Sequence, residues 1–217
     1  MQRGQRAGWR NLEDRPSAEE PVNIGNRSCP VEVPVGSLAL NRSEEAIAVY
    51  DDVVRRFGEA TEPGIREQVA AALRNKGVAL GALNRSEEAI AVYDDVVHRF
   101  GDATEPVIRE QVAGALFNKG VGLGALNRSK EAIMVYDEVL RRFGEATEPG
   151  TREGVAGALR NKGCRLGVLK RTEEALAVYD DMIRRFADAT EPAIQDVVER
   201  AKADRDELRP PGAAASG

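Results

Sequence analysis

Residues 84–126 read NRSEEAIAVYDDVVHRFGDATEPVIREQVAGALFNKGVGLGAL, and this stretch decides the fold. Nearly the same text precedes it over residues 41–83 and follows it over residues 127–169, and a more divergent copy begins at residue 170. The aromatic residues keep a constant interval of 43 residues: Tyr50, Tyr93, Tyr136 and Tyr179, then Phe57, Phe100, Phe143 and Phe186. A fixed period of this length predicts stacked structural repeats, each burying its apolar face on its neighbours.

Each copy contains two helical patterns, which are clearest in residues 84–126. The first predicts a helix over about 86–100, with Ser86 as the N-cap and an apolar stripe at helical spacing. The second predicts a helix over about 106–125, because Pro106 suits a first turn, where its missing N–H would have no partner. The repeating unit is therefore an antiparallel helix pair, and the chain is predicted to be all-α.

The ends of the array differ from its middle. We expect a disordered or irregular segment over residues 1–36, a helical repeat domain over 37–208 and a disordered tail over 209–217. The domain divides into copies at 41–83, 84–126, 127–169 and 170–208, the last with a capping helix at about 192–208. Charged residues surround the single apolar face of that capping helix, as a terminal repeat requires.

The first copy lacks most of the long helix that precedes each later short helix. Where other copies have some twenty residues, the chain before Ser43 offers only VPVGSLAL. A short helix over 43–57 is therefore expected to miss part of its packing partner.

Composition excludes several classes of function. The net charge of −5 and the pI near 5.2 argue against binding to a nucleic-acid backbone. No apolar run approaches the roughly 18 residues that cross a bilayer, and the first residues show no secretory signal. Two cysteines, Cys29 and Cys164, are too few for a disulfide framework, so a reducing cytoplasm is expected. The preference for Arg over Lys, with abundant Ala, Gly, Val and Asp, suggests a bacterial source.

The residues that could carry chemistry form no catalytic group. The single His98 has no His partner for a metal site or a base pair, and adjacent acidic residues such as Asp94 and Asp95 point in different directions on a helix. We therefore expect no enzyme activity, no metal and no cofactor.

The repeated residues resemble the tetratricopeptide repeat. The pattern Leu116-x-x-x-Gly120-x-x-Leu123, followed by Ala132 and Tyr136, matches that family's large residue, Gly, second large residue, Ala and aromatic. Two equivalent sets share the pattern: Leu73, Gly77, Leu80, Ala89 and Tyr93, and Leu159, Gly163, Leu166, Ala175 and Tyr179. The 43-residue unit is longer than the family's usual 34, because both helices and the RFGEATEP link are extended.

The resemblance implies a right-handed α-solenoid whose concave face, lined by the first helix of each family unit, binds a peptide or a partner protein. Family members that clamp acidic C-termini use Asn beside basic residues at the corresponding positions. The partner-binding positions carried over on this basis are Arg74, Asn75, Val78, Phe117, Asn118, Val121, Arg160, Asn161 and Cys164. Phe117 interrupts the basic series.

Two features of this face leave alternatives open. Lys76, Lys119 and Lys162 lie within the apolar stripe, so each is expected either to pair with an acid of the adjoining short helix, such as Asp94, or to face a ligand. Several other groove positions are glycine or alanine, which favours either close helix packing or an apolar ligand; they are Ala71, Gly114, Gly157, Gly81, Gly124 and Gly167.

The sequence thus predicts a non-enzymatic interaction scaffold for a protein or peptide partner, with no nucleic acid and no membrane involved. The alternative is self-association, as a dimer or an end-to-end stack, through the incompletely capped first repeat. Copies 41–83 and 84–126 are nearly identical, so an uncovered N-terminal end would already fit another helix pair.

Overall fold

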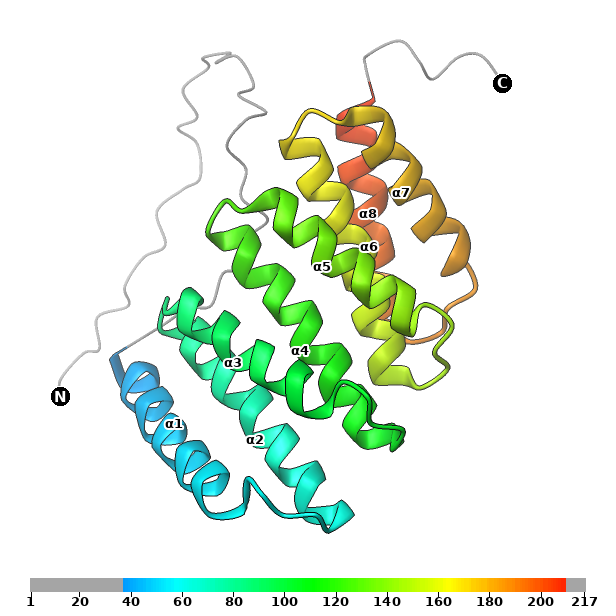
Figure 1. Ribbon diagram of the computed structural model, residues 1–217. Coiled ribbons are helices and arrows are strands. Elements are labelled where there is room, and N and C mark those ends of the chain that lie inside the picture. The colour runs from blue at the N-terminus through cyan, green and yellow to red at the C-terminus, as the bar shows by residue number, and fades with distance from the viewer. Residues whose placement is uncertain (1–36, 210–217) are drawn as a thin grey trace, which may run out of the picture.

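The computed structural model describes residues 37–209, which form only helices joined by short turns (Figure 1). The helices are α1 (Ser37–Phe57), α2 (Pro63–Ala82), α3 (Ser86–Phe100), α4 (Pro106–Ala125), α5 (Ser129–Phe143), α6 (Pro149–Val168), α7 (Thr172–Arg185) and α8 (Pro192–Leu208). Helices α3, α4 and α8 have the bounds that the sequence pattern predicts. Proline is the first residue of each even-numbered helix, as the first-turn preference for Pro predicts.

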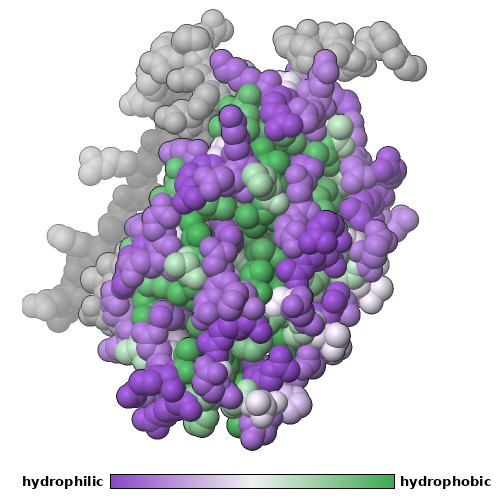
Figure 2. Space-filling view, in the orientation of Figure 1, coloured by the Kyte–Doolittle hydropathy of each residue, from purple (hydrophilic) through white to green (hydrophobic). Residues whose placement is uncertain are grey.

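The helices stack in chain order from α1 at one end of the array to α8 at the other (Figure 1). Each helix packs on the next one along the chain, so the molecule is a series of antiparallel pairs. On the face seen in Figure 2, hydrophobic residues show in bands between hydrophilic ridges. The described residues contain no helix long and apolar enough to cross a membrane.

The turns between repeats differ from the sequence-based expectation. Ser86 is not the N-cap of α3; Arg85 holds that position, and no side chain caps the helix. The turn depends instead on Asn84, whose φ of 59° is left-handed, a conformation that Asn tolerates better than most residues. Two backbone bonds close this turn, from the Arg85 N–H to the Leu80 carbonyl and from the Asn84 N–H to the Gly81 carbonyl.

Helix α1 also differs from expectation, because it begins at Ser37 and runs through Asn41 without a turn. The turn at Asn84 needs carbonyl acceptors at the end of a preceding helix. The residues at the equivalent positions in the first copy, Ser37 and Leu38, are themselves the first residues of α1. The irregular segment predicted over residues 1–36 lies outside the described residues.

The core repeats one contact, in which the ring of a tyrosine of an odd-numbered helix packs directly on a glycine of the preceding even-numbered helix. A Cβ atom on Gly120 would lie 2.4 Å from the Tyr136 ring, and the pairs Gly77–Tyr93 and Gly163–Tyr179 are equally close. The three tyrosines are 1–4% exposed. We call this pairing the Tyr–Gly contact.

At the N-terminal end this packing stops. Phe57 is 46% exposed, whereas its equivalents Phe100, Phe143 and Phe186 are 2–8% exposed. Among the described residues, the first repeat is therefore less covered than the later ones.

The Tyr–Gly contact predicts that Gly120→Ala destabilises the fold by about 1–3 kcal/mol, because the added methyl overlaps the Tyr136 ring. Gly154→Ala in α6 is the matched control, since nothing lies within 4 Å of its Cβ position. This control should raise the free energy of unfolding by up to about 1 kcal/mol through better helix propensity. Denaturant unfolding of both variants measures the difference, and equal effects would contradict the contact.

Candidate partner-binding face

The array has an inner and an outer layer of helices. Each of the even-numbered helices α2, α4, α6 and α8 contacts the next even-numbered helix, whereas no two odd-numbered helices of the described chain contact each other. Because one layer is drawn together and the other is spread, the array curves toward its even-numbered helices. These helices therefore provide the concave face.

An apolar row crosses this concave face. Val78 of α2, Val121 of α4 and Cys164 of α6 occupy equivalent positions; Val78 is 47% exposed, and the other two are half-buried. Helical spacing places Val107 and Ala125 on the same side of α4 as Val121, and both are exposed. We call Val78, Val121 and Cys164 the inner row.

Acidic side chains lie on the same side, toward the beginning of each even-numbered helix. Glu110 and Glu153 hold equivalent places on α4 and α6, and both are exposed. Asp196 of α8 follows at the same register and is exposed as well. The concave face therefore combines an apolar half with an acidic half.

The next set of predicted partner-binding residues bridges adjacent helices. Arg74 of α2 reaches over Gly114 of α4, and Phe117 of α4 covers Gly157 of α6 in the same manner. Arg160 of α6 pairs with Asp204 of α8 at 2.9 Å, with only 18% of its side chain exposed. These side chains form the floor of the concave face, so Gly114 and Gly157 serve close packing.

The predicted asparagine ladder is partly engaged with core tyrosines. Burial raises the pKa of the Tyr93 phenol to about 12, while Arg74 and a hydrogen bond with Asn118 act in the opposite direction. Burial likewise raises the pKa of Tyr136 to about 12, and a hydrogen bond with Asn161 opposes it. Asn75, on α2, is half-buried. Each of Asn118 and Asn161 thus leaves only part of its amide for a ligand.

The three lysines are paired with aspartates of the preceding helices. Lys76 lies 2.5 Å from Asp51, Lys119 2.5 Å from Asp94, and Lys162 2.6 Å from Asp137. The C-terminal helix substitutes Arg205, which pairs with Asp180 at 3.0 Å. Only 21% of the Lys119 side chain is exposed, against 52% of the Asp94 side chain, so the pair lies at the surface.

Cys164 of the inner row is half-buried, and the Arg165 guanidinium donates a hydrogen bond to its sulfur at 3.7 Å.

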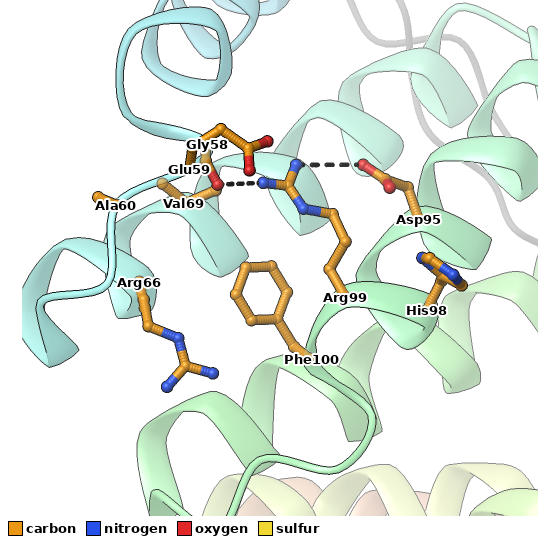
Figure 3. Close-up of a pocket in the computed structure, with 9 residues that line it drawn as sticks. All are labelled: Gly58, Glu59, Ala60, Arg66, Val69, Asp95, His98, Arg99 and Phe100. Carbon is orange, nitrogen blue, oxygen red and sulfur yellow. Dashed lines mark hydrogen bonds and ion pairs between the residues drawn. The ribbon is translucent and has the colours of Figure 1, made fainter.

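Sequence reasoning missed a hollow of about 520 Å³ at the junction of the first two repeats (Figure 3). The Phe100 ring lies there between two arginines, with the guanidinium carbons of Arg66 and Arg99 at 6.0 and 5.6 Å from its centre. Arg99 donates to the carbonyl of Gly58, and Arg66 pairs with Glu105 at 2.6 Å. Both arginines already have protein partners. The residues around this hollow therefore form the contact between the first two repeats.

The same contact between neighbouring repeats recurs along the array. Arg142 and Arg185 donate to the carbonyls of Gly101 and Gly144, as Arg99 does to Gly58. In the sequence, an Arg precedes every repeated Phe, and this pattern could have indicated the contact between repeats. The part of the chain that the structure describes holds no group of three or more His, Cys, Asp or Glu that could bind a metal.

Comparison with known proteins agrees with this geometry. Residues 38–104 match the tetratricopeptide repeat family. The fold is TPR-like. A crystal structure of a putative kinesin light chain from Podosopora anserina, with nearly identical TPR-like repeats, superposes with a TM-score of 0.56 at 15% identity. The match covers 79% of this chain and 86% of that one, and at this identity it shows the fold alone.

No curated protein matches the sequence. TPR domains generally act as protein-interaction modules and are typically not enzymes.

The exposure of the Lys119–Asp94 pair predicts that Lys119→Met changes the free energy of unfolding by less than about 1 kcal/mol, because water already solvates Asp94. Lys130→Met, at an exposed position of α5, is the control and should also have little effect. Urea unfolding of both variants provides the measurement. A loss above about 2 kcal/mol for Lys119→Met alone would indicate a strongly desolvated pair.

Proposed function

We propose that the protein is a non-enzymatic scaffold that binds an extended peptide or a protein segment on the concave face of its TPR-like array. The observation that carries the proposal is the inner row, an apolar strip that continues across three packed helices. An extended chain crossing the helices could contact one row position per helix.

The proposed ligand combines apolar and basic side chains. Apolar residues would cover Val78 and Val121, while Glu110, Glu153 and Asp196 would attract positive charge along the acidic half of the face. Arg74, Phe117 and Arg160 of the floor would act chiefly by holding the helices at their spacing. This places ligand selection on the inner row and the acidic positions.

Selection from a random displayed peptide library tests the proposal. We expect enriched peptides with alternating apolar and basic residues, whose binding weakens at least about tenfold in Val121→Asp, because a carboxylate would then face apolar ligand groups. Met134→Asp on α5 is the matched control, since Met134 is 69% exposed in the outer layer. Peptides that bind both variants equally would refute a concave-face site, and so would a selection without enrichment.

Self-association is the second candidate, favoured by the exposed Phe57 of α1. Of the two modes of self-association, the end-to-end stack has less support than the dimer. Asp206 of α8 holds the register position of Gly163 in α6. Helix α8 therefore lacks the glycine on which Tyr50 of another copy would pack in a Tyr–Gly contact. The N-terminal ends of two copies would instead face each other in a symmetric dimer.

Light scattering over a dilution series tests this candidate. A dimer through α1 should dissociate on dilution, and Phe57→Asp should make the protein monomeric at every concentration, because it introduces charge into an apolar contact. Met134→Asp should leave the association unchanged. A wild-type protein that is monomeric throughout would exclude self-association.

A further inference from the structure

Helix α5 departs from the preceding short helices at two exposed positions in its first two turns. Residues 129–136 read SKEAIMVY, whereas residues 43–50 and 86–93 both read SEEAIAVY. The two departures are Lys130 and Met134; both side chains are exposed, and Met134 is 69% exposed. Residues four positions apart share one side of a helix, so these two side chains are neighbours on the outer layer.

Lys130 replaces a glutamate that links repeats elsewhere in the array. At the first two junctions, an arginine of the turn pairs with a glutamate of the preceding short helix: Arg85 with Glu44 at 3.4 Å, and Arg128 with Glu87 at 3.1 Å. At the third junction the equivalent residues are Arg171 and Lys130, both cations. Arg171 keeps an ion pair with Glu174 at 2.7 Å, but its side chain is 46% exposed, against 37% for its two equivalents.

The turn before α7 gains a second cation. Asn84 and Asn127 occupy this position in the two earlier turns, each with a φ of 59°, and Lys170 adopts the same left-handed conformation with a φ of 58°. Asn tolerates this conformation better than Lys, because its short polar side chain can bond to the local backbone. The geometry of the turn therefore gives no reason for Lys170.

Both lysines weaken a local feature of the fold, and both add positive charge to the same junction. Lys130 removes an ion pair between repeats, and Lys170 removes the residue that best suits the turn. Neither lysine forms an ion pair with any of the described residues. Departures from local rules without a structural gain are expected at functional sites. We call Lys130, Met134, Lys170 and Arg171 the outer cluster.

The outer cluster suits an acidic protein segment better than a nucleic acid or a phosphate group. The whole chain carries a net charge of −5, which repels a long polyanion. Two N–H groups of the turn are already bonded to carbonyls of α6: Lys170 to Gly167, and Arg171 to Leu166. Recognition there falls to side chains. The exposed thioether of Met134 adds an apolar contact, and Met and Arg are both enriched at protein interfaces.

We propose that the outer cluster binds a segment of a partner protein in which acidic residues flank an apolar one. The acidic side chains pair with the three cations, and the apolar side chain covers Met134. This surface belongs to α5 and to the turn before α7, whereas the inner row belongs to the even-numbered helices. It is therefore a second binding site, and it does not depend on the function proposed for the concave face.

Restoring the residues of the second junction tests the proposal. Peptides are selected on the wild-type protein from a displayed library rich in Asp, Glu and apolar residues. Their binding should weaken at least about tenfold in the double variant Lys130→Glu with Lys170→Asn, because residue 130 would then repel the ligand. Lys202→Glu makes the same charge reversal in α8, at a side chain that is 43% exposed, and should weaken binding less than about twofold. Equal binding by all three proteins, or a selection without enrichment, would overturn the proposal.

The nature of the partner is tested at Met134. Met134→Ala restores the residue of the other short helices and should weaken the selected peptides at least about threefold, because their apolar residue loses its contact. A thymidine oligonucleotide and vesicles containing phosphatidylserine serve as alternative anionic probes. If either binds the wild-type protein more tightly than the selected peptides do, the acidic protein segment is the wrong ligand class.

Urea unfolding separates binding from stability. The double variant should unfold at a urea concentration no lower than the wild type does, since it regains the ion pair and the asparagine turn. A lower midpoint would show that Lys130 and Lys170 support the fold, and this would contradict the premise of the proposal.

Discussion

The Tyr–Gly contact is the constraint on which the array depends. A ring lying on bare backbone lets an odd-numbered helix approach the preceding even-numbered helix closely, and the contact occurs at Tyr93, Tyr136 and Tyr179. These three rings are almost fully buried, so each contact fixes the distance and the rotation of two helices. Since the contact recurs at one register, the even-numbered helices come to lie side by side, and the concave face is a consequence of that alignment.

The differences between nearly identical copies follow from their neighbours. Gly114 and Gly157 are needed because Arg74 and Phe117 of the preceding helix occupy the space of a Cβ. Ala71 holds the same register in α2, and no described helix precedes α2 on that side. Ala71 can therefore carry a methyl group, because no side chain of a preceding described helix occupies that space.

Much of the fold could be predicted from the sequence, because helical periodicity and proline at first turns act locally. The bounds of α3, α4 and α8 follow from such signals, and the acidic partner of Lys119 follows from the cost of burying an ammonium group. The start of α1 and the cap of α3 could not be predicted, since both depend on whether a preceding helix supplies acceptors for the turn at Asn84.

For the candidate site residues, the helices that carry them could be predicted, but their contacts could not. Family resemblance selected Arg74, Phe117 and Arg160 as partner-binding positions, whereas in the structure these side chains reach sideways to the next helix. The Arg99–Gly58 contact was missed, because the sequence shows the Arg before each repeated Phe but not its acceptor, which is a backbone carbonyl.

The charged outer side of α8 has a consequence for how such chains change length. Residues 84–126 pack on both sides against surfaces like their own, so a tandem duplication of this segment would create no interface of a new kind. Asp206 takes the place of glycine only in the last helix, so added units must enter before α8. The length of the concave face could therefore grow by whole units during evolution, while the terminal helix stays unchanged.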